Sequence, residues 1–166
     1  MVIIPGKAIY LATPRSASRT TTKVLTALGG TFISPHHNTA ISVIAAKKKY
    51  SLPTITLLRD PLHMMLSWWW PNRNKLSFAN HIIGSMGMWA QGRIYPYYDV
   101  TDEYFPFAPT PVGGVGAFLE HLGLSTDVEI PQIGNNYTDP SCITEEHRQQ
   151  CYKRFPADAE LWRSQR

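Results

Sequence analysis

Residues 8–22, AIYLATPRSASRTTT, contain the most informative pattern in the sequence. The first five of these residues, 8–12, are apolar or small and have the length and composition of a buried strand. A polar loop with hydroxyl side chains and two arginines follows, and residues 18–28 then have the pattern of a helix that Gly29 and Gly30 end. A strand, a polar loop and a helix in this order predict the first step of an α/β fold.

The same order recurs twice further along the chain. Residues 31–34 are a short strand before a helix at 38–47, and residues 54–58 are a third strand before a helix at 62–69. Strands that alternate with helices are joined by crossovers, which place them parallel in one sheet with helices on both faces. We therefore expect an α/β protein with three layers, α/β/α, around a central parallel sheet.

The pattern is weaker after Trp70. It indicates a helix within residues 74–91, a strand at 103–107, a helix at 112–122, and two terminal helices at 145–155 and 158–166. The chain has 166 residues and shows no internal repeat and no clear linker, so we expect a single domain over residues 1–166.

Composition and charge limit the kinds of ligand and partner that we expect for this chain. The net charge of +4 favours anionic ligands. The basic run at 47–49 follows an apolar segment and is typical of a solvated helix end, so we expect no nucleic-acid partner. No apolar stretch approaches the roughly 20 residues of a membrane span, and no signal peptide is recognisable, which favours a cytoplasmic protein without membrane insertion. No clustered carboxylates or Cys–His set indicates a metal.

The loop after the first strand has the composition of an anion site. Free amides at a helix N-terminus, hydroxyl groups such as those of Ser16 and Ser18, and the guanidinium of Arg15 are the donors that a phosphate group needs. The loop lacks the G-x-x-x-x-G-K-[ST] pattern of nucleoside-triphosphate binding. The alternative is that Ser16 and Ser18 only cap the helix and that the arginines are surface charges.

A second polar position follows the third strand. Arg59 comes directly after that strand, and Ser67 lies eight residues later, about two helical turns on. Open α/β sheets bind ligands at the carboxyl ends of their strands, so the two loops predict a ligand with two separated phosphates. The alternatives are a local ion pair between Arg59 and Asp60, and a Ser67 hydroxyl that bonds to its own helix backbone.

Together, the segment PRSAS at 14–18 and RDP at 59–61 with Ser67 resemble the two cofactor motifs of the sulfotransferase family. The closing segment YKRFPADAELW, residues 152–162, is similar to that family's C-terminal segment. The resemblance implies a compact version of the P-loop-NTPase-like sulfotransferase fold. Ala17 stands where the family usually has glycine, and Arg19 stands where it has threonine.

The resemblance also implies the ligand and the residues that hold it. The cofactor is 3′-phosphoadenosine 5′-phosphosulfate (PAPS), which leaves as adenosine 3′,5′-bisphosphate (PAP). The residues implied for the 5′-phosphosulfate are Arg15, Ser16, Ala17, Ser18, Arg19 and Thr20. Arg59 and Ser67 are implied for the 3′-phosphate. Arg15 also stabilises the charge that develops on the bridging oxygen.

The candidate base is His37, because it follows the second strand at the same predicted sheet edge and neutral imidazole accepts a proton near pH 7. His36 is the substitute candidate. The reaction is transfer of the sulfuryl group to a hydroxyl or amine of a glycan or small molecule. Two alternatives remain, a nucleotide-binding module without turnover and a nucleotide-dependent phosphotransferase, and the sequence leaves open whether the chain forms a homo-oligomer.

Overall fold

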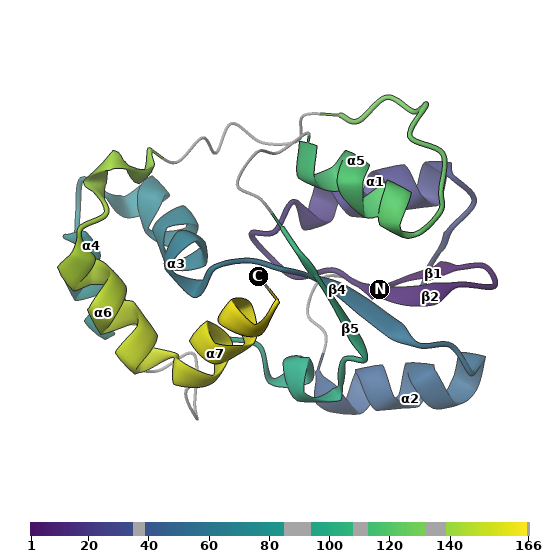
Figure 1. The fold of residues 1–166 in the computed structure, drawn as a ribbon, viewed down its shortest axis with the longest axis horizontal. Helices are drawn as coiled ribbons and strands as arrows, with labels where there is room; N and C mark the ends of the chain where they lie inside the picture. The colour runs from purple at the N-terminus through teal and green to yellow at the C-terminus, as the bar shows by residue number, and fades with distance from the viewer. Residues whose placement is uncertain (35–38, 85–93, 108–112, 132–138, 166) are drawn as a thin grey trace. The chain divides into compact units, whose positions relative to one another are not determined.

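The computed structural model describes residues 1–34, 39–84, 94–107, 113–131 and 139–165 (Figure 1). The chain forms two compact units. The first consists of Met1–Leu58 and Pro96–Gly134, and the second of Arg59–Tyr95 and Asn135–Arg166. Each unit is thus assembled from two separate segments of the sequence. This division does not test the expectation of a single domain, which stays a prediction.

The first unit contains a sheet of five strands in the order β3-β1-β2-β4-β5. Their bounds are Val2–Ile4 for β1, Ala8–Leu11 for β2, Thr31–Phe32 for β3, Thr54–Leu58 for β4 and Glu103–Pro106 for β5. Strand β4 has the bounds that the sequence predicts. Strand β3 is only two residues long, and both residues are exposed. It lies at the edge of the sheet, where a short strand needs less burial.

The sheet is mixed, which corrects the expectation of a purely parallel sheet. β2 pairs with β4 and β4 with β5 in parallel, but β1 is antiparallel to both of its neighbours, β2 and β3. The sequence analysis missed β1, which has only three residues. A tight turn joins it to β2: the Lys7 amide donates to the Ile4 carbonyl at 3.0 Å, and Gly6 takes the left-handed φ of 67°. A short hairpin of this kind needs no crossover helix.

Helices cover both faces of this sheet. In Figure 1, α1 (Ser18–Ala27) and α5 (Gly113–His121) lie on one face and α2 (Ala40–Tyr50) lies on the other. The 3-10 helix η4, Pro96–Val100, packs against α2. The three predicted layers are therefore present within the first unit, and the α/β class is confirmed.

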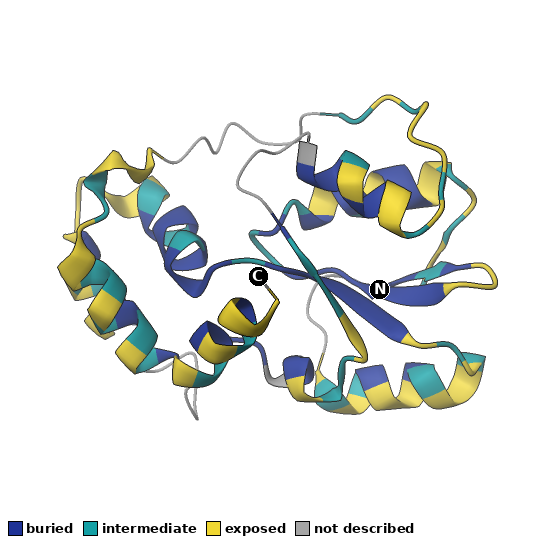
Figure 2. Ribbon diagram, in the orientation of Figure 1, coloured by how far each residue is buried: buried dark blue, intermediate teal, exposed yellow. Residues whose placement is uncertain are grey.

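The core of the first unit lies between the sheet and the helix pair α1 and α5. Every residue of β2 and β4 is buried, as central strands with both faces covered require (Figure 2). Tyr10 of β2 packs on Phe118 of α5 with ring centroids 5.6 Å apart. Val24 and Leu25 of α1 join the same cluster. Each such side chain contributes roughly 1.5–3 kcal/mol by leaving water.

The regular elements of the second unit are all helices in its described residues. It contains α3 (Pro61–Trp69), α4 (Phe78–Gly84), α6 (Glu145–Arg154), α7 (Pro156–Ser164) and the short 3-10 helices η1 (Trp70–Asn72) and η5 (Pro140–Cys142). Helix α3 packs against α4, α6 and α7. The helix predicted within 74–91 is observed as α4, and residues 85–93 lie outside the described part of the chain.

The closing segment owes its pattern to packing within the second unit. Phe155, between α6 and α7, is fully buried, and Trp162 of α7 is nearly so. Asp158 is also buried, and its carboxylate accepts a hydrogen bond from the Ile94 amide at 2.5 Å. Buried charges require partners of this kind. In the described ranges, no helix has both the length and the apolar character that crossing a bilayer requires.

Candidate anion-binding loop

The loop between β2 and α1 turns through two left-handed residues. Arg15 has a φ of 66°, and Ala17 has φ 51° and ψ 24°. For residues with a Cβ atom this region costs about 1–2 kcal/mol each. Two such residues within three positions make the loop a strained turn, and strain of this kind persists only where the surroundings fix it.

Helix α1 begins after this turn without a side-chain cap. Ala17 stands at the N-cap, and its methyl side chain makes no capping hydrogen bond to the first turn. The amides of this turn point out of the helix at the positive end of its dipole. The arrangement therefore favours an anion at the start of α1. Ala17 is the N-cap and Ser18 is the first residue of α1, so neither Ser16 nor Ser18 stands at the N-cap position.

The predicted side chains of this loop differ in exposure. Ser16 is fully buried, and Ser18 and Thr20 are each only 7% exposed. Arg15 is half-buried, whereas Arg19 is exposed. The hydroxyl groups thus belong to the inner side of the loop and the start of α1, and Arg19 belongs to the surface.

Hydrogen bonds hold both ends of the loop. At its start, the Ser16 amide donates to the Thr13 carbonyl at 3.3 Å. At its end, the Ala17 carbonyl accepts two bonds from Thr21, one from the amide at 2.9 Å and one from the hydroxyl at 3.1 Å. These two hydrogen bonds from Thr21 hold the carbonyl of Ala17 in place and close the first turn of α1.

Three further hydroxyl groups lie beneath the loop. The Tyr97 hydroxyl donates to Thr13 Oγ1 at 3.1 Å, and Thr13 Oγ1 lies 2.6 Å from Thr56 Oγ1. Tyr97 comes from η4, 84 positions along the chain from Thr13. The sequence analysis did not single out Tyr97, and no local pattern pairs it with the loop, because the contact depends on how η4 lies against the sheet.

The second motif begins where β4 ends. β4 pairs directly and in parallel with β2, with Leu11 opposite Thr56, so the chain leaves both strands at the same edge of the sheet. Arg59, the next residue, is half-buried, and Ser67 is buried in α3. Arg59 and Ser67 belong to the second unit and Arg15 to the first. Their joint use for one ligand stays a prediction.

Asp60 has a structural role in the second unit. Its carboxylate caps α3 by accepting from the Leu62 amide at 2.8 Å, and it accepts from the Tyr152 hydroxyl at 3.0 Å. The Arg148 guanidinium lies 3.9 Å from the same carboxylate. Burial, followed by the charge of Asp60, raises the pKa of the Tyr152 phenol above its ordinary value. Asp60 therefore ties α6 to the start of α3.

The predicted base lies outside the described residues, as do His36 and the turn that contains both. The role of His37 stays a prediction. Four other histidines are described. His147 caps α6, since its Nδ1 accepts from the Thr144 amide at 3.2 Å. His121 pairs with Glu103, His63 lies 3.9 Å from Asp60, and partial burial lowers the pKa of His81.

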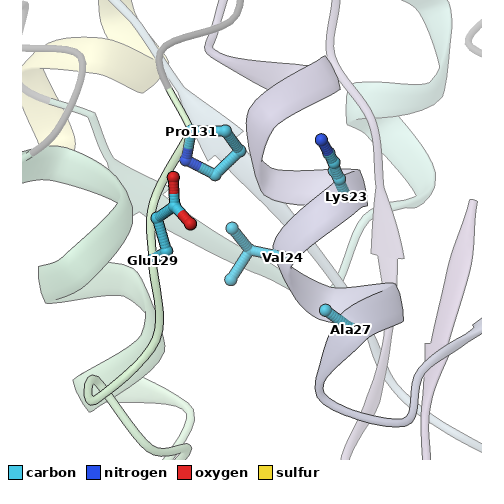
Figure 3. A pocket seen from close by; sticks show the side chains of 5 residues that line it. All are labelled: Lys23, Val24, Ala27, Glu129 and Pro131. Atoms are coloured by element: carbon cyan, nitrogen blue, oxygen red, sulfur yellow. The ribbon is translucent and has the colours of Figure 1, made fainter.

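A small hollow lies beside α1, away from the predicted loop (Figure 3). Lys23, Val24 and Ala27 line it from α1, and Glu129 and Pro131 line it from the segment after α5. Its volume is about 120 Å³. Small-molecule sites usually enclose about 300 Å³ or more, so this hollow does not accommodate a nucleotide.

No group of three His, Cys, Asp or Glu side chains suited to a metal ion occurs in the described ranges. The sequence matches no family model, and it has no match among the curated proteins or the solved structures.

Proposed function

We propose that this chain is a sulfotransferase that binds PAPS and transfers its sulfuryl group to a hydroxyl or amine of a glycan or small molecule. The observation that carries the proposal is the strained loop 14–17, which leads through the N-cap residue Ala17, whose side chain makes no capping bond, into the start of α1 at the carboxyl end of a parallel strand pair. Such a helix start is a ready site for a phosphate group. The sulfotransferase fold, in its compact form, is part of the same proposal.

The residues of the first motif supply donors for the 5′-phosphosulfate. The amides of Ser18 to Thr20 at the helix start and the hydroxyl groups of Ser16, Ser18 and Thr20 are short-range donors. Ala17 contributes backbone only, and Arg19 adds positive charge at the surface. Arg15 binds the 5′-phosphate and stabilises negative charge on the leaving oxygen; because arginine hardly releases a proton, its help is electrostatic.

The remaining parts of the proposal rest on the sequence. Arg59 and Ser67 hold the 3′-phosphate. His37 accepts the proton of the acceptor group as its oxygen or nitrogen bonds to sulfur, and the bond from sulfur to the bridging phosphate oxygen breaks, which releases PAP. PAPS supplies the activated sulfuryl group, and the scheme needs no metal.

Ligand-induced stabilisation tests binding first. Thermal unfolding is measured with PAP, ATP and 5′-AMP at equal concentrations, because a ligand at about 100 times its Kd stabilises the folded state by roughly 2.7 kcal/mol. We expect a rise in Tm with PAP and little change with the other two. A larger shift with ATP would indicate a phosphotransferase, and no shift with PAP removes the proposal.

Variants then separate binding from turnover. Arg15→Ala is expected to lower kcat for sulfuryl transfer from PAPS by about 100-fold or more, by analogy with the loss of one oxyanion donor. Arg59→Ala is expected to raise the Kd for PAP. The matched control is Arg73→Ala, which removes an exposed arginine that contacts Trp70. PAP binding without turnover in the wild type would favour a binding module.

A further inference from the structure

Three buried hydroxyl groups, those of Tyr97 in η4, Thr13 after β2 and Thr56 in β4, form a row of hydrogen bonds. Tyr97, Thr13 and Thr56 are at most 1% exposed. The row ends on backbone, because the Thr56 hydroxyl donates to the Leu11 carbonyl at 2.8 Å. All three residues belong to the first unit, so the row is defined by contacts within that unit.

The donor and the acceptor of each hydrogen bond in this row can be assigned. A hydroxyl group donates once. Thr56 uses its proton on the Leu11 carbonyl, so the proton in the 2.6 Å contact between Thr13 and Thr56 comes from Thr13. Thr13 therefore accepts from Tyr97. The row runs in one direction, from Tyr97 through Thr13 and Thr56 to the carbonyl of Leu11.

The first donor of the row keeps its proton. Burial raises the pKa of the Tyr97 phenol well above its ordinary value, and the hydrogen bond to Thr13 opposes this only in part. The phenol is thus a neutral donor over the whole physiological pH range. A buried hydroxyl group without a hydrogen-bond partner destabilises the folded state, so each hydrogen bond of the row stabilises this arrangement.

The row acts on the residue from which the strained turn starts. Thr13 stands immediately before Pro14 and Arg15, and its carbonyl accepts the Ser16 amide. At the other end, Thr21 fixes the Ala17 carbonyl. The left-handed conformations of Arg15 and Ala17 therefore lie between two anchors, and only the first anchor depends on a distant part of the chain.

We infer that Tyr97 is a positioning residue for this loop: by its hydrogen bond to Thr13 it holds the loop 14–17 in the conformation that presents the amides at the start of α1. The conformation of the loop thereby depends on the 3-10 helix η4. That this conformation serves PAPS rests on the proposed function, whereas the anchoring itself is a property of the chain without ligand.

Hydrogen–deuterium exchange of the unliganded full chain tests the anchoring. In Tyr97→Phe, we expect the Ser16 amide, which donates to the Thr13 carbonyl, to exchange roughly tenfold faster than in the wild type, because loss of a buried hydrogen bond favours local opening. The control is Tyr104→Phe, which removes a different hydroxyl bond to η4, from Tyr104 to the Tyr98 carbonyl. Equal acceleration in both variants, at matched global stability, would overturn the inference.

Two substitutions of Thr13 test the role of its hydroxyl group in a second exchange experiment. Thr13→Val keeps the shape of the side chain but loses the hydroxyl group, and Thr13→Ser keeps the hydroxyl group. We expect faster exchange of the Ser16 amide in Thr13→Val and near wild-type exchange in Thr13→Ser. If the two variants exchange alike, the hydroxyl group has no positioning role and the inference fails.

PAP binding separates this inference from the proposed function. If the wild type binds PAP, Tyr97→Phe is expected to raise its Kd roughly tenfold, while Tyr104→Phe leaves it within about twofold. An unchanged Kd in Tyr97→Phe would contradict the link between anchor and site. If the wild type does not bind PAP, the proposed function fails, and the exchange experiment still decides the anchoring.

Discussion

Ala17 adopts a left-handed backbone conformation that disfavours a residue with a Cβ atom. Its φ of 51° and ψ of 24° favour glycine. We predict that Ala17→Gly stabilises the protein by up to about 1 kcal/mol, because relief of about 1–2 kcal/mol of backbone strain outweighs the loss of one half-buried methyl group. The free energy of unfolding in urea measures this.

An alanine in ordinary helical conformation is the matched control. Ala45 lies exposed within α2, and Ala45→Gly is expected to destabilise the protein by about 0.5–1 kcal/mol, the usual effect of glycine in a helix interior. The two Ala→Gly substitutions should therefore have opposite signs. A loss of stability in Ala17→Gly as large as in Ala45→Gly would contradict the argument from strain.

The link between α3 and α6 is an element-scale interaction. Tyr152→Phe removes the hydrogen bond to Asp60, and we expect a loss of about 1–2 kcal/mol in unfolding free energy, since the acceptor is a buried carboxylate. Asp60→Ala removes the same bond together with the α3 cap, so a loss of about 2–4 kcal/mol is expected.

A double-mutant cycle in urea checks that the two residues act together. Because the Tyr152–Asp60 bond is absent in either single variant, the effect of the double variant should be smaller than the sum of the two by about 1 kcal/mol. Additive effects would mean that the 3.0 Å contact contributes nothing to stability.

The junction of α2, β4 and β5 predicts an acid-dependent contribution to stability. Burial of the Asp102 carboxylate opposes its ionisation, but hydrogen bonds from Lys47 and from the amide and hydroxyl of Thr54 outweigh that effect and hold its pKa below 3.8. A lowered pKa in the folded state stabilises the protein above the unfolded value, and this stabilisation is lost as the pH falls through the folded value.

Asp102→Asn should therefore lower the free energy of unfolding at about pH 7 and have a smaller effect near pH 3. The measurement is urea unfolding of both proteins across this range. Asp127→Asn serves as control, because Asp127 is exposed and, in the described ranges, no hydrogen bond to its carboxylate is found. A difference that does not depend on pH would contradict the role of the Asp102 charge.

Elements with a regular pattern were predictable from the sequence, and elements that depend on distant contacts were not. β4 was predicted with its observed bounds because a run of five apolar or β-branched residues is short and of a composition that favours a strand over a helix. β1 was missed because three residues carry no periodicity. For the loop, its place after β2 was predictable, but the left-handed Ala17 and the bond from Tyr97 to Thr13 follow from tertiary structure alone.

At the scale of the whole molecule, the covalent path ties the two units together. The chain passes from the first unit into the second after residue 58, the last of β4, and returns to the first unit at residue 96, the first of η4. Unfolding of the second unit alone would leave a long loop that the first unit must keep closed, at an entropic cost that grows only slowly with length. The second unit, which consists of residues 59–95 and 135–166, is also small enough to be marginal by itself.

We therefore predict a single cooperative unfolding transition. Four of the five tryptophans, at positions 68, 69, 70 and 162, are described and belong to the second unit, so tryptophan fluorescence reports mainly on that unit, whereas far-ultraviolet circular dichroism reports on both. The midpoints of the two signals in urea should coincide, as two-state unfolding requires. In Tyr152→Phe, which weakens only the second unit directly, both midpoints should move by the same amount. A fluorescence midpoint that moves while a later dichroism transition stays in place would show that the units unfold independently, and the expectation of one domain over residues 1–166 would then be wrong.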